Sequence, residues 1–201
     1  MVVGQAALLL TGSVNQGTIV APFSVSVIAV LSVRLMQGMG RKQFVTKQLV
    51  VPEAFERFCA DFNAGRFYEA HEHLEEVWQF EKGPVRDLYK GLIQAAAAYV
   101  HLSRGGYVGA WRLLTTALGY LEPYAEGPAM GFDVRHVADV LEQALAELQG
   151  LGPADVSRFP LELRPLMRVD RRVIPAEARR WGAWGFDEQG QPMTMEVTLA
   201  A

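Results

Sequence analysis

The residues best suited to chemistry are concentrated in one short stretch, residues 67–78 (FYEAHEHLEEVW). With about 100° of rotation per helical residue, His71 and Glu75 lie one turn apart on the same side of a helix, at the edge of its apolar face. Tyr68 lies beside them, and Glu72 lies further toward solvent. The remaining charged residues of the stretch are expected to point into water as surface charge: Glu69, His73 and Glu76.

A second polar stripe interrupts the next apolar segment, where Lys90, Gln94 and His101 lie on one side of a predicted helix. If the two helices pack antiparallel, His71 and Glu75 face this stripe. Because buried charges are costly unless they are paired or used, the expected result is an enclosed polar group with Glu72 at its rim.

Three interpretations of this group remain open. In the first, it is a structural hydrogen-bond network that fixes the register of the helices. In the second, a divalent metal is held by His71 and Glu75 at i, i+4, with His101 as a further ligand. In the third, His71 is an acid–base catalyst oriented by Glu75 and acts on a small molecule. The candidate ligand-binding residues are Glu72, Lys90, Gln94 and Tyr68.

Several known motifs are absent from the sequence. The zincin pattern His-Glu-x-x-His fails because residue 75 is glutamate, and the two Glu-x-x-His elements of di-iron bundles do not occur. The sequence also contains no phosphate loop, dinucleotide fingerprint, nucleophile elbow or zinc-knuckle spacing. These absences argue against nucleotide-dependent enzymes and triad hydrolases, and whether the protein is an enzyme stays undecided.

The elements that position these residues are helices. Apolar residues recur at helical spacing in five segments separated by Gly- and Pro-containing turns, with no strand pattern between residues 52 and 149. The predicted helices cover about 52–62, 66–80, 84–104, 107–124 and 134–148. Short loops favour antiparallel neighbours, so the fold class is all-α, a single bundle of about five antiparallel helices over residues 52–149. The alanines at 95–98 allow close helix approach and make the third helix the central one.

The motif residues resemble a known family. The stretch 62–78, the block 90–96 with His101, and the later segment 109–114 resemble the Domain of Unknown Function 309 family over about residues 52–125. The resemblance implies a small helical bundle of the kind found in bacteria and archaea, with no assigned biochemical function. A label of metal-dependent hydrolase used for such proteins implies metal-dependent hydrolysis as an expectation. The matching positions are Asn63, Gly65, Glu69, His71, Glu72, Glu75, Trp78, Lys90, Gly91, Gln94 and His101.

Residues 1–50 form an apolar extension, and residues 1–33 carry no charged side chain. Three interpretations stay open: a disordered extension or a translation start that is really at Met36 or Met39, a membrane anchor through 19–31, or a strand or signal segment. An anchor is disfavoured by Pro22 and the recurrent serines. Basic residues after 33 would keep the rest of an anchored chain in the cytoplasm.

Residues 150–201 form a Pro- and Arg-rich irregular tail. Trp181, Trp184 and Phe186 are too apolar for a free linker, so the tail is expected to wrap over the bundle, with a short hairpin turning at 187–190. Prolines and acidic residues interrupt the arginines, which argues against a nucleic-acid-binding arm.

Charge and composition bound the function further. Nineteen basic and twenty-two acidic residues give a net charge of -3, which provides no long-range field for nucleic acid or membrane. The single cysteine, Cys59, lies among phenylalanines at helical spacing and is expected to be a buried thiol in a reducing, cytoplasmic compartment. The sequence thus predicts binding of a metal ion or small polar ligand, with hydrolysis as a candidate activity and a homo-oligomer as a candidate assembly. The alternative is a non-catalytic interaction or assembly module.

Overall fold

The computed structural model describes residues 44–200. In chain order its elements are β1 (Phe44–Leu49), α2 (Val51–Asn63), α3 (Phe67–Trp78), α4 (Arg86–Ser103), α5 (Tyr107–Leu121), a 3-10 turn (Glu122–Tyr124), α6 (Val134–Leu151), a second 3-10 turn (Val156–Arg158), α7 (Ile174–Trp181) and β2 (Met195–Ala200). The predictions for segment 19–31 and for the translation start lie outside the described residues. Among residues 44–200, no helix combines the length and the hydropathy that a membrane crossing requires.

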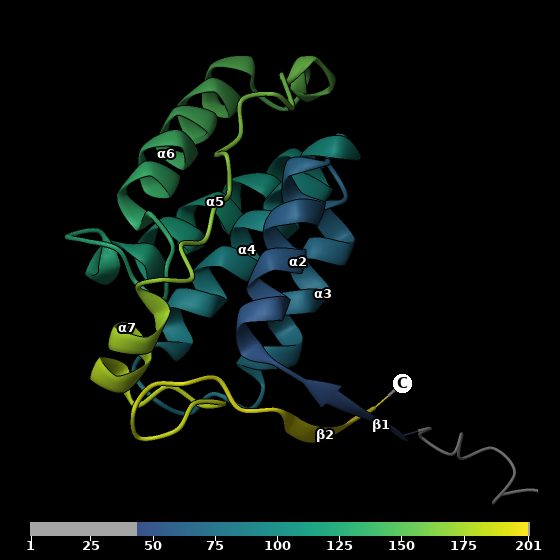
Figure 1. Ribbon diagram of the computed structural model, residues 1–201. Helices are drawn as coiled ribbons and strands as arrows, with labels where there is room; N and C mark the ends of the chain where they lie inside the picture. Colours follow the sequence, from purple (N-terminus) through teal and green to yellow (C-terminus); the bar gives the residue numbers. More distant parts are fainter. Residues whose placement is uncertain (1–43, 201) are drawn as a thin grey trace, which may run out of the picture. The chain divides into compact units, whose positions relative to one another are not determined.

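The predicted all-α bundle is confirmed, and its helices α2–α6 end within a few residues of the predicted bounds. α4 packs against both α3 and α5, while α2 packs on α3 and α6 packs on α5 (Figure 1). More than half of the residues of α4 are buried, including three of the four alanines at 95–98. The small side chains thus let neighbouring helices close around α4, as the alanine block predicted.

Aromatic side chains form the centre of the core. The apolar stripe of α2 buries Phe55, Phe58 and Phe62 completely. The Phe55 ring lies 5.4 Å from Tyr89 of α4 and 5.2 Å from Phe132 in the loop before α6. Each such side chain contributes about 1.5–3 kcal/mol by burial, so this cluster holds the helices together and fixes how α3 and α4 are presented.

Cys59 lies in this core, which confirms the predicted buried thiol. Burial, with a smaller effect of the nearby Glu56 charge, raises the pKa of Cys59 to about 12. Because the thiolate is the reactive form, we expect Cys59 to react with a disulfide reagent at pH 8 roughly a thousandfold more slowly than an unperturbed thiol. The rate of thionitrobenzoate release, compared between native protein and protein in guanidinium chloride, measures this. Stoichiometric release from native protein within minutes would show an accessible thiolate.

The tail after α6 packs on the bundle. Phe159, Met167, Ile174, Ala178 and Phe186 are buried as part of the same hydrophobic core as the helices. The Trp184 ring stacks on Phe80 at 5.0 Å, and Trp181 meets Tyr124 edge-on at 5.7 Å. These aromatic contacts explain why the tail carries so many large apolar side chains.

The extended part of the tail is attached by hydrogen bonds to its backbone. The Asn63 side chain at the end of α2 donates to the carbonyl of Met167 at 2.8 Å and accepts from the Met167 N–H at 2.9 Å. The Tyr99 hydroxyl of α4 donates to the Leu163 carbonyl at 2.5 Å. Arg164 in turn donates to the Asn63 carbonyl at 3.0 Å. Asn63, one of the family-matching positions, therefore acts as a clamp for the tail backbone.

The predicted short hairpin is present. It turns at 187–190, where the Gly190 N–H donates to the Asp187 carbonyl at 2.9 Å, and beside the turn Phe186 pairs antiparallel with Pro192. The strand that follows, β2, pairs antiparallel with β1 rather than with its own neighbouring segment, so that Lys47 lies opposite Val197. The strand β1 also lies within the segment 1–50 that was interpreted as an extension. The two ends of the described chain are therefore joined in one small sheet beside α3. This pairing joins residues 152 positions apart, such as Thr46 and Thr198, and a local sequence pattern could not predict it.

Candidate functional site

The strongest pair of candidate residues comes together on α3. His71 Nε2 lies 3.5 Å from Glu75 Oε2, one helical turn away. The side chains are 24% and 49% exposed, so the pair lies at the surface of the bundle rather than in a closed interior. The Tyr68 ring lies 5.9 Å from the His71 ring. A hydrogen bond to the Glu72 carboxylate, together with the charges of Glu72 and Glu75, raises the pKa of Tyr68 because the neutral phenol is the donor.

Two buried polar atoms in the predicted site have no hydrogen-bond partner. Among residues 44–200 four buried side-chain atoms are unpaired, and they include His71 Nδ1 and Gln94 Oε1. Gln94 lies on α4, the helix that packs on α3. Because Nε2 of His71 faces the Glu75 carboxylate, a neutral imidazole with its proton on Nε2 leaves Nδ1 as an acceptor. In that tautomer both unpaired atoms are acceptors that lack a donor within residues 44–200.

The other two predicted partners on α4 point elsewhere. Lys90 places its ammonium 4.6 Å from the centre of the Tyr120 ring on α5, as a cation–π contact. The His101 ring packs so closely on Gly109 of α5 that a Cβ there would lie 2.4 Å from its Nδ1. His101 is also two helical turns, about 10 Å, beyond Gln94. The expected enclosed group of five residues is thus not assembled, because α4 directs Lys90 and His101 toward α5.

The metal interpretation loses its third ligand for the same reason. His71 and Glu75 are neighbours, but His101 is not brought to them. Within the described range, 44–200, there is no group of three or more His, Cys, Asp or Glu side chains that could hold a metal ion. The described residues therefore do not fit the predicted three-ligand centre.

A pocket of about 430 Å³ borders the same face of α3. It is lined by Glu72, Glu75, Glu76, Trp78, Gln79 and Leu199. Two of these residues, Glu72 and Glu75, are predicted site residues, and Leu199 comes from β2. The volume lies in the range of small-molecule sites, and the carboxylates make the wall electronegative. A ligand with amine or other donor groups is complementary to such a wall.

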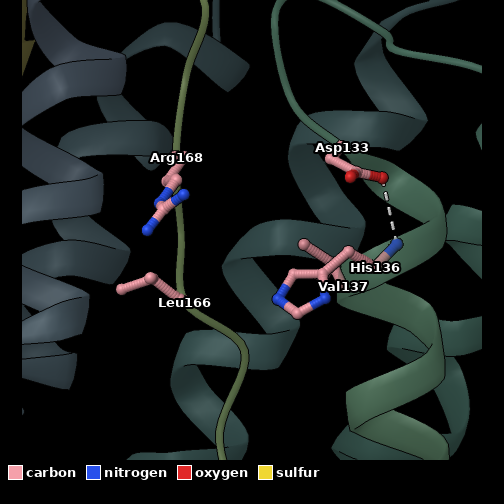
Figure 2. Close-up of a pocket in the computed structure, with 5 residues that line it drawn as sticks. All are labelled: Asp133, His136, Val137, Leu166 and Arg168. Atoms are coloured by element: carbon pink, nitrogen blue, oxygen red, sulfur yellow. Dashed lines mark hydrogen bonds between the residues drawn. The ribbon is translucent and has the colours of Figure 1, made fainter.

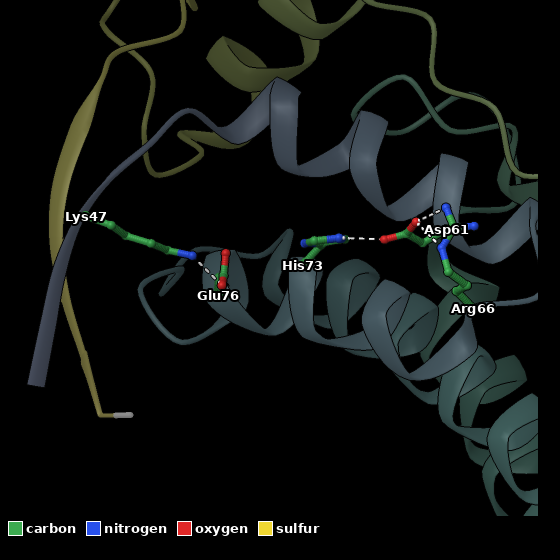
Figure 3. Close-up of polar contacts among 5 residues, drawn as sticks. All are labelled: Lys47, Asp61, Arg66, His73 and Glu76. Carbon is green, nitrogen blue, oxygen red and sulfur yellow. Dashed lines mark hydrogen bonds and ion pairs between the residues drawn. The ribbon is translucent and has the colours of Figure 1, made fainter. Parts of the chain in front are cut away.

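Two residues interpreted as surface charge have structural partners instead. His73 Nε2 lies 2.8 Å from Asp61 Oδ2 of α2, and Glu76 forms an ion pair with Lys47 of β1 (Figure 3). The prediction that His73 and Glu76 only face water is therefore wrong. The reason is tertiary: α2 and β1 pack on the face of α3 that an isolated helix would present to solvent.

Asp61, near the end of α2, connects the loop after α2 with α3 through its contacts with Arg66 and His73. Burial alone would raise its pKa, but hydrogen bonds from Arg66, whose Nε lies 2.9 Å away, and from His73 outweigh this and hold the pKa of Asp61 below its ordinary value. A carboxylate with a lowered folded-state pKa contributes stability that is present above its unfolded value of 3.8 and is lost as the pH falls through the folded value. Asp61 therefore contributes to acid sensitivity below about pH 4 and not near neutrality.

No sequence pattern pointed to Glu81, which is the one charged side chain fully buried among the described residues, at 1% exposed. Its carboxylate accepts from the Gly83 N–H at 2.6 Å and from the Trp184 N–H at 2.9 Å. It therefore joins the α3–α4 loop to the tail, close to the buried hydroxyl of Tyr89. Burial, and then the charge of Glu81, raise the pKa of Tyr89 well above its usual range.

The fold and the site together define the class: a small helical-bundle protein with a polar, partly open site on its second bundle helix. Residues 55–113 match the family model described as "Domain of unknown function (DUF309)", which confirms the family resemblance of the motif residues. A similar protein is the "Uncharacterized protein YpuF" of Bacillus subtilis (strain 168), which is 26% identical over 136 residues, or 65% of this chain and 77% of the relative. No solved structure matches the chain.

Proposed function

We propose that the protein binds a small polar molecule at His71, Glu75 and Gln94, and that the recognised group is an amine. The observation that carries this proposal is the pair of buried acceptors, His71 Nδ1 and Gln94 Oε1, that have no donor within residues 44–200. Buried acceptors without a partner cost free energy, and a ligand that supplies N–H groups removes that cost. The neighbouring carboxylates favour a positively charged donor over a neutral one.

The nearby pocket provides the space that such a ligand needs. Glu75 both contacts His71 and lines the pocket of about 430 Å³, so a bound molecule can extend from the His71 edge along α3. In a reaction, His71 would be the candidate general base, because it lies beside Glu75 and its Nδ1 has no partner within residues 44–200. Hydrolysis stays a proposal for this site and would need a water held by the same acceptors.

Binding of amines tests the proposal. We expect putrescine, spermidine or ethanolamine to raise the melting temperature of the protein, with binding confirmed by isothermal titration calorimetry. Removing one hydrogen bond to a charged ligand costs about 1.5–3 kcal/mol, so His71→Ala and Gln94→Met should each weaken binding by roughly 10- to 100-fold. Gln143→Met, which replaces an exposed glutamine of α6 outside the site, should leave amine affinity unchanged and serves as the matched control.

Three results would overturn the proposal. One is that no amine binds the native protein at millimolar concentration. Another is that His71→Ala and Gln94→Met lower stability without changing amine affinity, which would make the group a structural network. The third is stoichiometric Zn²⁺, Mn²⁺ or Mg²⁺ in metal analysis of the purified protein that is lost in His71→Ala and Glu75→Gln, which would assign the acceptors to a cation.

A further inference from the structure

A second pocket lies between the start of α6 and the extended tail. It has a volume of about 310 Å³ and is lined by Asp133, His136, Val137, Leu166 and Arg168. Asp133 immediately precedes α6, and His136 and Val137 lie in its first turn, whereas Leu166 and Arg168 come from the tail on the other wall (Figure 2). Small-molecule sites often lie at such junctions between packed units.

The tail wall of the pocket carries an arginine, Arg168, whose side chain is not paired with any residue in the described part of the chain. Three neighbouring arginines of the tail are all engaged: Arg164 donates to the carbonyls of Leu161 and Asn63, Arg171 pairs with Glu56, and Arg172 pairs with Asp170. Arg168 has no ion pair or hydrogen bond from its side chain with any residue in the described part of the chain. Its planar guanidinium is therefore available for a carboxylate.

The helix wall carries the opposite charge. One carboxylate oxygen of Asp133, Oδ1, accepts from the His136 N–H at 3.1 Å and caps α6. The second oxygen has no partner among residues 44–200. Because the cap already satisfies the start of the helix, a ligand here must be held by side chains and not by the helix terminus. Asp133 and Arg168 line opposite walls of the pocket and do not form an ion pair with each other (Figure 2).

Each wall of the pocket also carries an apolar residue, Val137 on α6 and Leu166 on the tail. Val137 is buried, and Leu166 is 48% exposed although it lies beside a cavity. An aliphatic group placed between them would cover the exposed part of Leu166 and remove apolar surface from water. The pocket thus presents three chemistries at once: a cation, an anion and an apolar surface.

We infer that this pocket binds a small zwitterion with an aliphatic side group, that is, a free α-amino acid. Its carboxylate contacts Arg168, with the His136 imidazole beside it, and its ammonium contacts the free oxygen of Asp133. Its side chain lies on Val137 and Leu166. This site does not depend on the His71 site, because it uses different residues on different elements.

Calorimetric titration of the full chain with leucine, valine, methionine and phenylalanine tests this inference. We expect at least one of these to bind, and to bind at least tenfold more tightly than acetate or butylamine, which each supply one charge. Arg168→Gln and Asp133→Asn should each weaken binding tenfold or more, and asparagine keeps the helix cap, so the fold is retained. Arg158→Gln, which removes another exposed tail arginine, should bind as the native protein does.

The inference is overturned if none of the four amino acids binds, or if Arg168→Gln and Asp133→Asn bind as tightly as the native protein. It is also overturned if the only effect of these two variants is a lowered melting temperature, since Arg168 and Asp133 would then simply pair with each other in solution. Amino acid binding that persists in His71→Ala separates this site from the amine site on α3.

Discussion

Replacing Glu81 with glutamine is expected to destabilise the protein by about 2–4 kcal/mol. The carboxylate is buried, and each of its oxygens accepts a backbone N–H, from Gly83 at 2.6 Å and from Trp184 at 2.9 Å. Glutamine has one acceptor oxygen and one NH₂ group. One of the two backbone N–H groups would therefore face another donor in a buried site, and the link between the α3–α4 loop and the tail would weaken.

Urea denaturation of native and variant protein, followed by circular dichroism and analysed as a two-state transition, measures this change. Glu142→Gln is the matched control, since Glu142 is exposed on α6 and its substitution should change stability by less than about 0.5 kcal/mol. Equal midpoints for Glu81→Gln and Glu142→Gln would show that Glu81 does not hold the tail on the bundle.

Replacing Gly190 with alanine is expected to cost a similar amount, about 2–4 kcal/mol, for a steric reason. Gly190 has φ +78°, a conformation that residues with a Cβ rarely adopt. A Cβ there would also lie 1.9 Å from the carbonyl oxygen of Pro175 in the first turn of α7. The Pro175 carbonyl is part of the backbone, and a Cβ at residue 190 is bonded directly to the backbone. The clash can therefore be relieved only by moving the 187–190 turn away from α7.

A glycine-to-alanine substitution at Gly119 should have the opposite effect on stability. Gly119 lies within α5, is exposed, and has no heavy atom within 4 Å of a built Cβ. Alanine is favoured over glycine in a helix interior, so Gly119→Ala should stabilise the protein by about 0.5–1 kcal/mol. A thermal melt of the two variants beside the native protein decides the matter: a melting temperature of Gly190→Ala at or above the native value would contradict the close approach of the turn to Pro175.

The position of the candidate site on its helix could be predicted from the sequence, but its composition could not. The angular positions of His71 and Glu75 depend only on helical periodicity, and the two residues are indeed neighbours at 3.5 Å. Whether Lys90 and His101 face them depends on where α5 lies. Tyr120 and Gly109 of α5 draw these two side chains away, and no pattern within α3 or α4 carries that information.

Local sequence was enough to predict the helical class, the bounds of the bundle helices within a few residues, the buried Cys59 and the His71–Glu75 pair on α3. These features follow from local periodicity, turn residues and backbone geometry, which act over neighbouring positions. Packing between distant segments sets the partners of His73 and Glu76, the buried role of Glu81, and the pairing of β1 with β2. It also sets which polar atoms on α3 and α4 lack a partner. The reason is that such contacts join residues far apart in the chain, as Glu81 and Trp184 are by 103 positions, and depend on the path of the whole backbone.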